Sequence, residues 1–304
     1  MPSINQLNEE RENLWFQEDL ESLKEEIKKN NGKDQKEEPE QTNKYKEMID
    51  KQTGPITHWN RWNPEISLTF DDGYWKDNIK HILDTLKSSW IHATFFILWD
   101  CLKLNPDLWK QAVEEWHQVC CHTYSHIYLS DNSDTTNLRS KLNQDVDIDS
   151  WGNNVRNLLW EEYYKNLKAE SWWEFPNKIK SDLLLETEIL MWEEQVRRTL
   201  WDSYLQNLKQ NYPFFRFPGW CGARIPKNIA VLKKLWYLSI WWSDDFYNKQ
   251  RKHLSVDYMK SMDIENWDIP LFHFKKDDYK YLDAYIENIK DKNKAPKQVS
   301  DIIQ

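Results

Sequence analysis

Four features are missing from the sequence, and each argues against a class of protein. No apolar run reaches the roughly 18 residues that a membrane-spanning helix needs, so no transmembrane segment is predicted. The net charge of -9 argues against a nucleic-acid partner, for which a basic face is expected. The four cysteines form no Cys-x-x-Cys pair, which argues against a disulfide framework and a structural zinc site. The first residues lack the basic and apolar regions of a secretory signal, so we expect a cytoplasmic protein or an incomplete start.

The length of 304 residues predicts one large domain with attachments. Residues 1–54 are dense in Glu, Lys, Asn and Gln, which favours a charged N-terminal stalk or linker that is helical or disordered. The main domain is expected over residues 55–295. It is interrupted at about 130–180 by a polar insertion, which we interpret as helical, and residues 296–304 are predicted to be a C-terminal tail.

The main domain begins with alternating strands and helices. Residues 66–70 alternate apolar and polar side chains with the period of a strand, and residues 91–98 read as a strand buried on both faces. Residues 117–121 predict a third strand. Between these strands, apolar residues at helical spacing predict a helix over 78–89, and Asn105-Pro106 predicts the start of a helix that runs to about residue 115. This alternation predicts βαβ units and a parallel sheet.

The second half of the domain continues the pattern after a long amphipathic segment. We predict one helix over 183–208, strands over 214–217, 237–242 and 269–272, and helices over 225–235 and 282–289.

Five predicted strands end in polar residues that are suited to chemistry. In α/β proteins, the carboxyl ends of the strands are where active sites usually lie. A single Asp or His at such a place is more often a turn, cap or hydrogen-bonded structural residue. Five on successive strands favour a common site, made of Asp71/Asp72, His122/His126, Arg216, Asp244/Asp245 and His273.

These residues fall into motifs that resemble the polysaccharide deacetylases, the NodB-homology or carbohydrate esterase family 4 group. The resemblance covers roughly residues 64–290 without the insertion, and it implies a deformed (β/α) barrel. The five motifs occur in the family's order: Thr69-Phe70-Asp71-Asp72-Gly73, His122-Thr123-Tyr124-Ser125-His126, Arg216-Phe217-Pro218, the strand end from Trp242 to Asp245, and Leu271-Phe272-His273.

Asp72, His122 and His126 are the predicted metal ligands. The two histidines are four residues apart, so on one helical turn they would face the same way. Two His and one carboxylate leave positions open for water and substrate, as catalytic sites do. A zinc-type ion, with cobalt or a similar ion as the alternative, would polarise an acetamide carbonyl and lower the pKa of its bound water. Cys120 and Cys121 suggest a thiolate ligand, but we favour small buried residues there.

The resemblance implies the remaining roles. Asp71 would be the general base, since successive side chains diverge and it cannot easily share the metal with its neighbour. Arg216 would hold Asp71 ionised. The backbone N–H of Gly219 is a candidate oxyanion donor. Leu271 would line the pocket for the acetyl methyl group.

His273 is the candidate general acid for the leaving amine. A carboxylate, Asp245 in our interpretation and Asp244 in the alternative, would raise its pKa so that it carries a proton.

The implied function is metal-dependent hydrolysis of N-acetyl groups on N-acetylglucosamine polymers, with peptidoglycan or poly-N-acetylglucosamine favoured over chitin. An O-deacetylase acting on acetylated xylan is the enzymatic alternative, and a catalytically inactive carbohydrate-binding module is the other. The family works mostly outside the cell membrane, whereas this sequence shows no export signal, so the compartment stays open. No oligomeric state is indicated.

Glycine is scarce and tryptophan abundant. There are 6 glycines and 19 tryptophans, whereas a glycine frequency of about 7% would give roughly 21 glycines. Trp90, Trp116 and Trp236 follow predicted helices, where a left-handed residue, usually glycine, is expected. The family has glycine there and at Trp99 and Trp220. We therefore hypothesise that the gene uses UGA for glycine at these five positions. The alternative is a tryptophan-rich surface that binds carbohydrate.

Overall fold

A computed structural model of the chain describes residues 45–57, 63–124, 126, 129, 181–219, 221–245, 255–275 and 278–303. The predicted insertion at about 130–180, most of the predicted N-terminal stalk and Trp220 lie outside these residues. No helix among the described residues is long and apolar enough to cross a membrane.

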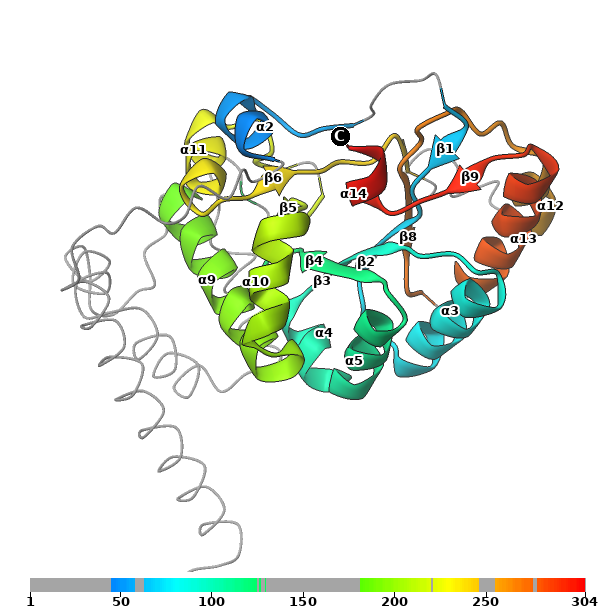
Figure 1. Cartoon of the computed structure of the whole chain (residues 1–304), viewed down its shortest axis with the longest axis horizontal. Helices are drawn as coiled ribbons and strands as arrows, with labels where there is room; N and C mark the ends of the chain where they lie inside the picture. Colours follow the sequence, from blue (N-terminus) through cyan, green and yellow to red (C-terminus); the bar gives the residue numbers. More distant parts are fainter. Residues whose placement is uncertain are drawn as a thin grey trace, which may run out of the picture.

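Seven parallel strands form one sheet that curls into a half-barrel (Figure 1). Its order is β6-β5-β4-β3-β2-β8-β7. Strands β2 to β6 follow one another across the sheet, and β8 returns to the free side of β2, so the predicted deformed (β/α) barrel is confirmed. The strands are β2 (Thr69–Asp72), β3 (Thr94–Ile97), β4 (Gln118–Cys121), β5 (Phe214–Phe215), β6 (Leu238–Ser239), β7 (Asp244–Asp245) and β8 (Pro270–His273).

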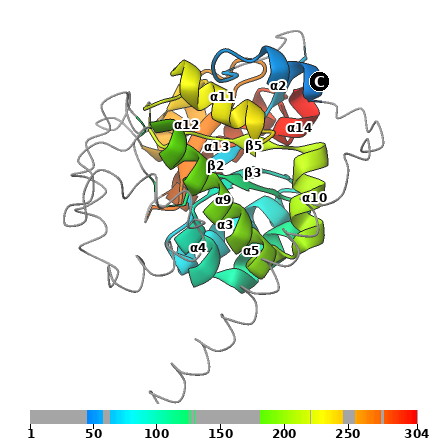
Figure 2. The same ribbon diagram turned by 90° about the vertical axis from the view of Figure 1, so that its left-hand side faces the viewer.

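Helices cover the outer face of this sheet, and Figure 2 shows the same arrangement from the side. The predicted helices following β2 and β3 are present. The helix bounds are α2 (Lys46–Lys51), α3 (Lys76–Ser88), α4 (Trp99–Leu104), α5 (Pro106–Glu114), α9 (Ser181–Leu200), α10 (Asp202–Asn211), α11 (Pro226–Lys234), α12 (Val256–Ser261), α13 (Asp278–Asp291) and α14 (Val299–Ile302).

The period-two pattern of β2 places apolar side chains on one face of the sheet and polar side chains on the other. The ring of Phe70 lies 5.2 Å from that of Phe95 and 5.4 Å from that of Phe272, on the side that the helices cover. Thr69 and Asp71 point to the other side, where both accept hydrogen bonds from Arg216. The alternation therefore turns Thr69 and Asp71 toward the inside of the half-barrel.

The predicted strand over 237–242 is shorter than expected because the chain changes partner. Ile240 N–H donates to the Phe215 carbonyl at one edge of the sheet, and Ser243 N–H donates to the Ile269 carbonyl at the other. Between them, Trp241 N–H donates to the carbonyl of Ile56. This stretch spans the opening between the two edges of the sheet.

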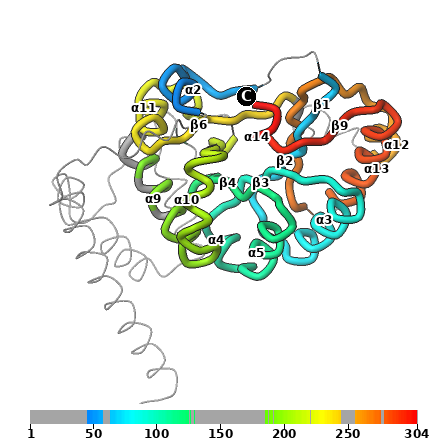
Figure 3. The backbone as a smooth tube through the Cα atoms, in the orientation of Figure 1, coloured from blue at the N-terminus to red at the C-terminus, as the bar shows by residue number. Residues whose placement is uncertain are grey.

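Both ends of the described chain pack on the domain, which differs from the predicted stalk and tail. Tyr45 and Ile49 are fully buried, and the Tyr45 ring lies 5.3 Å from that of Phe214. The Tyr45 hydroxyl donates to the Ser300 carbonyl and so joins the start of α2 to α14; the tube in Figure 3 shows α2 next to α11. These apolar residues are few among many charged ones, so composition alone concealed their place in the core.

The C-terminal residues form a second, two-stranded parallel sheet, in which β9 (Ala295–Pro296) pairs with β1 (Glu65–Ile66). Val299 and Ile302 of α14 are buried. The predicted tail at 296–304 is therefore part of the domain up to residue 303, the last that the structure describes.

The predicted single helix over 183–208 is two helices, α9 and α10, separated by Trp201. Trp201 has φ 75° and ψ 156°, which no helix accommodates. A periodic apolar pattern does not reveal such a break, because tryptophan itself fits the pattern. Helix α4, which the sequence did not predict, is a single short segment between β3 and α5.

Candidate active site

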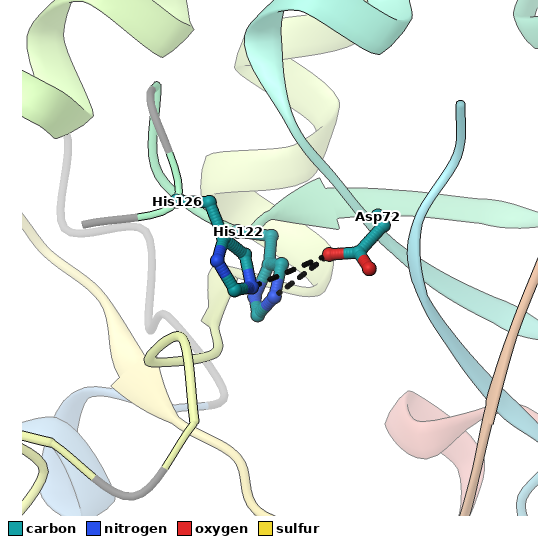
Figure 4. Close-up of side chains that lie close together, drawn as sticks. All are labelled: Asp72, His122 and His126. Atoms are coloured by element: carbon teal, nitrogen blue, oxygen red, sulfur yellow. Dashed lines mark ion pairs between the residues drawn. The ribbon is translucent and has the colours of Figure 1, made fainter. Parts of the chain in front are cut away.

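The carboxyl ends of β2 and β4 bring the three predicted metal ligands together (Figure 4). Asp72 Oδ1 lies 3.7 Å from Nε2 of His122 and 3.4 Å from Nε2 of His126. All three ligand atoms lie within 4.8 Å of one another. Ligand atoms about 2.0–2.2 Å from a tetrahedral ion are roughly 3.3–3.6 Å apart, so these distances are close to those that a divalent metal ion requires. Three protein ligands would leave a position open for water or substrate.

A backbone carbonyl fixes which nitrogen of His122 faces that site. Nδ1 of His122 lies 2.9 Å from the carbonyl oxygen of Arg216. A carbonyl oxygen only accepts hydrogen bonds, so Nδ1 must carry the proton and donate it. Nε2 then has its lone pair directed toward Asp72, which is the form of imidazole that binds a metal.

The two histidines do not lie on a helical turn, which corrects the reason for expecting them together. Thr123 has φ 75° and His126 has φ 58°, so the segment is a tight loop. His126 N–H donates to Thr123 Oγ1 at 3.1 Å, and Tyr124 N–H donates to the buried Glu188 carboxylate at 2.8 Å. Sequence reasoning missed Glu188, because it lies within the amphipathic α9 with no motif around it.

The expectation that the neighbouring carboxylates diverge is wrong. Asp72 has φ 81°, a left-handed conformation that Asp tolerates better than most residues. As a result, Asp71 Oδ2 and Asp72 Oδ1 both lie 3.7 Å from Nε2 of His122. What distinguishes the two carboxylates is their other partners rather than their direction.

Arg216 is the partner that sets Asp71 apart. Its NH1 donates to Asp71 Oδ1 and to Thr69 Oγ1, both at 2.8 Å, and its NH2 donates to the Trp241 carbonyl at 2.9 Å. The guanidinium is fully buried and lies 3.9 Å from the centre of the Phe96 ring. Burial lowers the pKa of Arg216 and Asp71 opposes that shift, so a buried ion pair holds the carboxylate in one orientation.

His273 lies beside Asp71, because the two residues are opposite one another on β8 and β2. Burial lowers the pKa of His273 well below its ordinary value, with the nearby cationic Lys275 adding to the effect. This direction is the opposite of the predicted one. The backbone of Asp245 pairs with Leu271 on the neighbouring strand, but the side chains of Asp244 and Asp245 lie outside the described residues.

Leu271 and Gly219 complete the predicted set. Leu271 is buried on β8 opposite Thr69, on the same face of the sheet as Asp71 and His273. Gly219 follows Arg216-Phe217-Pro218 in a turn, with φ 58°.

The alternative of a cysteine ligand is disfavoured. Burial raises the pKa of both Cys120 and Cys121 well above the ordinary value, which opposes the thiolate form that binds metals. Neither residue belongs to the cluster of metal-binding groups found in the described part of the chain.

Residues 60–157 match the family model of the polysaccharide deacetylases. An uncharacterised 30.6 kDa protein of Geobacillus stearothermophilus is 40% identical over 98 residues, which are 32% of this chain and 34% of that protein. A peptidoglycan-N-acetylglucosamine deacetylase of Bacillus cereus is 38% identical over 96 residues, 31% of this chain and 42% of that enzyme. The peptidoglycan-N-acetylglucosamine deacetylase PgdA of Listeria monocytogenes is 44% identical over 71 residues, 23% of this chain and 15% of that enzyme. The matches thus span less than half of these relatives.

Solved structures share the fold. PdaA of Bacillus subtilis, a family 4 carbohydrate esterase, superposes with a TM-score of 0.57 at 19% identity, covering 84% of this chain and 88% of that one. A family 4 pseudoenzyme of Bacillus anthracis has a TM-score of 0.56 at 15% identity, covering 84% and 70%. Residues 60–157 therefore carry a polysaccharide deacetylase domain of the NodB-homology or carbohydrate esterase family 4 group, and the described domain has the fold of that group's solved structures.

Proposed function

We propose that the protein is a metal-dependent polysaccharide N-deacetylase. One observation supports this proposal most strongly: a two-histidine, one-carboxylate cluster lies beside a second carboxylate that a buried arginine holds in place. A family 4 pseudoenzyme with the same fold exists, so the fold alone does not argue for activity. The argument rests on the residues that this chain carries.

Asp72, His122 and His126 would hold the metal ion. A divalent ion bound there, zinc in our proposal, supplies Lewis acidity that polarises the acetamide carbonyl and acidifies water. Nδ1 of His122 carries the proton and donates it to the Arg216 carbonyl, so Nε2 remains available as a ligand.

Asp71 takes the proton from the attacking water. It is 3% exposed, and its Oδ1 is engaged by Arg216, which leaves Oδ2 on the side of His122 and the cluster. The guanidinium favours the charged form of the carboxylate, which is the form that accepts a proton. Metal binding and proton abstraction are therefore assigned to adjacent residues of β2, Asp72 and Asp71.

His273 donates the proton to the leaving amine, and the backbone N–H of Gly219 stabilises the developing negative charge on the carbonyl oxygen. His273 must be protonated to donate, but burial lowers its pKa. In this proposal the Asp245 carboxylate raises the pKa of His273 and so opposes the effect of burial. Leu271 lines the pocket for the acetyl methyl group.

The proposed substrate is a polymer of N-acetylglucosamine. Relatives from Listeria and Bacillus are named as peptidoglycan-N-acetylglucosamine deacetylases, and one from Rhizobium leguminosarum, 43% identical over 65 residues, as a chitooligosaccharide deacetylase. Peptidoglycan or poly-N-acetylglucosamine is favoured over chitin.

The test is acetate release from N-acetylglucosamine oligomers and from peptidoglycan, with and without a chelator. The proposal expects release that the chelator abolishes and that added zinc restores. Release that persists in the chelator would contradict metal dependence. Binding of the oligomers with no release of acetate under any condition would instead support an inactive carbohydrate-binding module.

A further inference from the structure

Tryptophans occupy backbone conformations that belong to glycine. Within the described residues, nine residues other than glycine have positive φ, and five of those nine are tryptophan. Positive φ is uncommon for any residue with a Cβ and is an outlier for a bulky one. The five are Trp90 (58°), Trp116 (65°), Trp201 (75°), Trp236 (63°) and Trp267 (65°).

Three of them close helices in the same way. Trp90 follows α3, where its N–H donates to the Lys87 carbonyl and Ile91 N–H donates to the Leu86 carbonyl. This pair of hydrogen bonds is the Schellman motif, whose left-handed position is usually glycine. The same two bonds close α5, where Trp116 N–H donates to the Val113 carbonyl and the next N–H donates to that of Ala112. They also close α11, where Trp236 N–H donates to the Lys233 carbonyl and the next N–H donates to that of Leu232.

A fourth helix ends in the same way, with a different residue at the left-handed position. Helix α13 closes with the same two bonds, from Asn293 to Lys290 and from Lys294 to Ile289. Its left-handed residue is Asn293 with φ 51°, and asparagine is the usual substitute for glycine there.

Trp201 stands in a conformation that is still more restrictive. Its φ of 75° combined with ψ of 156° lies in a region that is essentially confined to glycine. It is the residue that separates α9 from α10.

The side chains of Trp90 and Trp116 make too little contact to account for their positions. Trp90 is 92% exposed and Trp116 is 77% exposed. Trp267 is buried, and its indole N–H has no hydrogen-bond acceptor among the described residues. Trp109 and Trp192 contrast with them: both are buried, neither has a positive φ, and their indole N–H groups donate to the carbonyls of Cys101 and Ile97.

We propose that residues 90, 116, 201, 236 and 267 are glycine in the protein that the source cell makes, because its UGA codons specify glycine although the printed sequence reads them as tryptophan. Backbone geometry thus supports three of the five positions singled out in the sequence and adds 201 and 267. Trp99 lacks a positive φ, and Trp220 lies outside the described residues, so the backbone supports neither. The exposed aromatic residues at 90 and 116 are then no platform for a sugar.

The gene and its natural product test this directly. We expect UGA codons at the five positions and UGG codons at Trp109 and Trp192, and mass spectrometry of peptides from the source cell should show glycine at the five. UGG codons throughout, or tryptophan in those peptides, would overturn the proposal.

Melting temperatures in an ordinary expression host give an independent check. Trp90→Gly and Trp116→Gly should each raise the melting temperature by about 2–4 °C, since each relieves a strained residue with little loss of packing. Trp109→Gly, the matched control, should lower it. Lower melting temperatures in all three variants would contradict glycine as the native residue.

A second inference, which rests on the proposed metal site, concerns Glu188. We infer that Glu188 is a positioning residue for the metal ligands. It is 3% exposed on α9, and its carboxylate accepts the Tyr124 N–H at 2.8 Å, midway along the loop between His122 and His126. That loop contains two residues with positive φ, so an outside anchor is what holds the two imidazoles at their spacing.

Zinc affinity, measured by competition with a chromophoric chelator, tests this inference. Glu188→Ala should weaken zinc binding about 10–100-fold, whereas Glu188→Gln, which keeps an acceptor oxygen, should bind almost as tightly as the wild type. Glu186→Ala, on the same helix and ion-paired outward with Lys234, is the control that should leave affinity unchanged. Equal affinity in Glu188→Ala would refute the inference, while a wild-type protein that binds no zinc would instead refute the proposed function.

Discussion

Replacement of the proposed base, Asp71→Asn, separates chemistry from metal binding. The asparagine amide has nearly the shape of the carboxylate, and its oxygen still accepts from NH1 of Arg216, which lies 2.8 Å from Asp71 Oδ1. The amide has no basic oxygen, so it cannot take a proton from water. The proposed metal ligands, Asp72, His122 and His126, are untouched.

The expected loss of activity follows from the contribution that a general base makes to the reaction rate. Such a group contributes about 10²–10⁴-fold to the rate, which is about 2.7–5.4 kcal/mol of barrier. We therefore expect kcat for acetate release to fall about 10²–10⁴-fold. Zinc affinity should change by less than about tenfold, because the residues assigned as ligands are intact.

The same substitution also affects stability, because it leaves the Arg216 charge buried without a counter-ion. Removing one partner of a buried ion pair costs about 3–5 kcal/mol. The retained hydrogen bond reduces that cost, so we expect about 1–3 kcal/mol and a melting temperature lower by about 2–12 °C. Activity should therefore be assayed well below the melting transition.

Acetate release and zinc titration on the same Asp71→Asn preparation give the result. Asp72→Asn is the matched comparison, and it should lose both zinc binding and turnover. Retention of more than about a tenth of wild-type activity by a folded, zinc-loaded Asp71→Asn variant would refute Asp71 as the base.

Three further predictions follow from the described contacts. His126→Ala removes one of three proposed ligands, so zinc affinity measured by chelator competition should fall at least about 100-fold, whereas unchanged affinity would remove His126 from the site. Arg216→Lys keeps the charge but loses the fork that joins Asp71, Thr69 and the Trp241 carbonyl, so the protein should melt lower and turn over more slowly, and wild-type behaviour would contradict the pair's role. Burial lowers the pKa of His117 from 6.5 to about 4, so below pH 6.5 the unfolded chain binds a proton that the folded chain does not. The free energy of unfolding in urea should therefore fall by about 3 kcal/mol from pH 6.5 to 4, and His117→Asn should not show this part of the loss.

The strand ends were predictable from the sequence because alternation and apolar runs are local. Phe70 and Asp71 face opposite sides of β2 for the reason that the period-two pattern gives. The grouping of Asp72, His122 and His126 followed from parallel strands, whose carboxyl ends meet at one edge.

What escaped prediction depends on backbone angles and distant contacts. The φ of 81° at Asp72 brings two neighbouring carboxylates to one imidazole, and no pattern in the sequence predicts that backbone angle. The hydrogen bond from Tyr124 to Glu188 joins residues 64 positions apart. The break at Trp201 was hidden because the side chain suits an amphipathic helix while the backbone angles do not.

Titration of metal-free protein with zinc tests the central claim most directly, with zinc binding and acetate release followed in the same sample. The account predicts that release begins with added zinc and saturates at one equivalent, and that Asp72→Asn shows neither tight binding nor release. Full acetate release by the metal-free protein, or zinc binding by Asp72→Asn as tight as that of the wild type, would contradict the account.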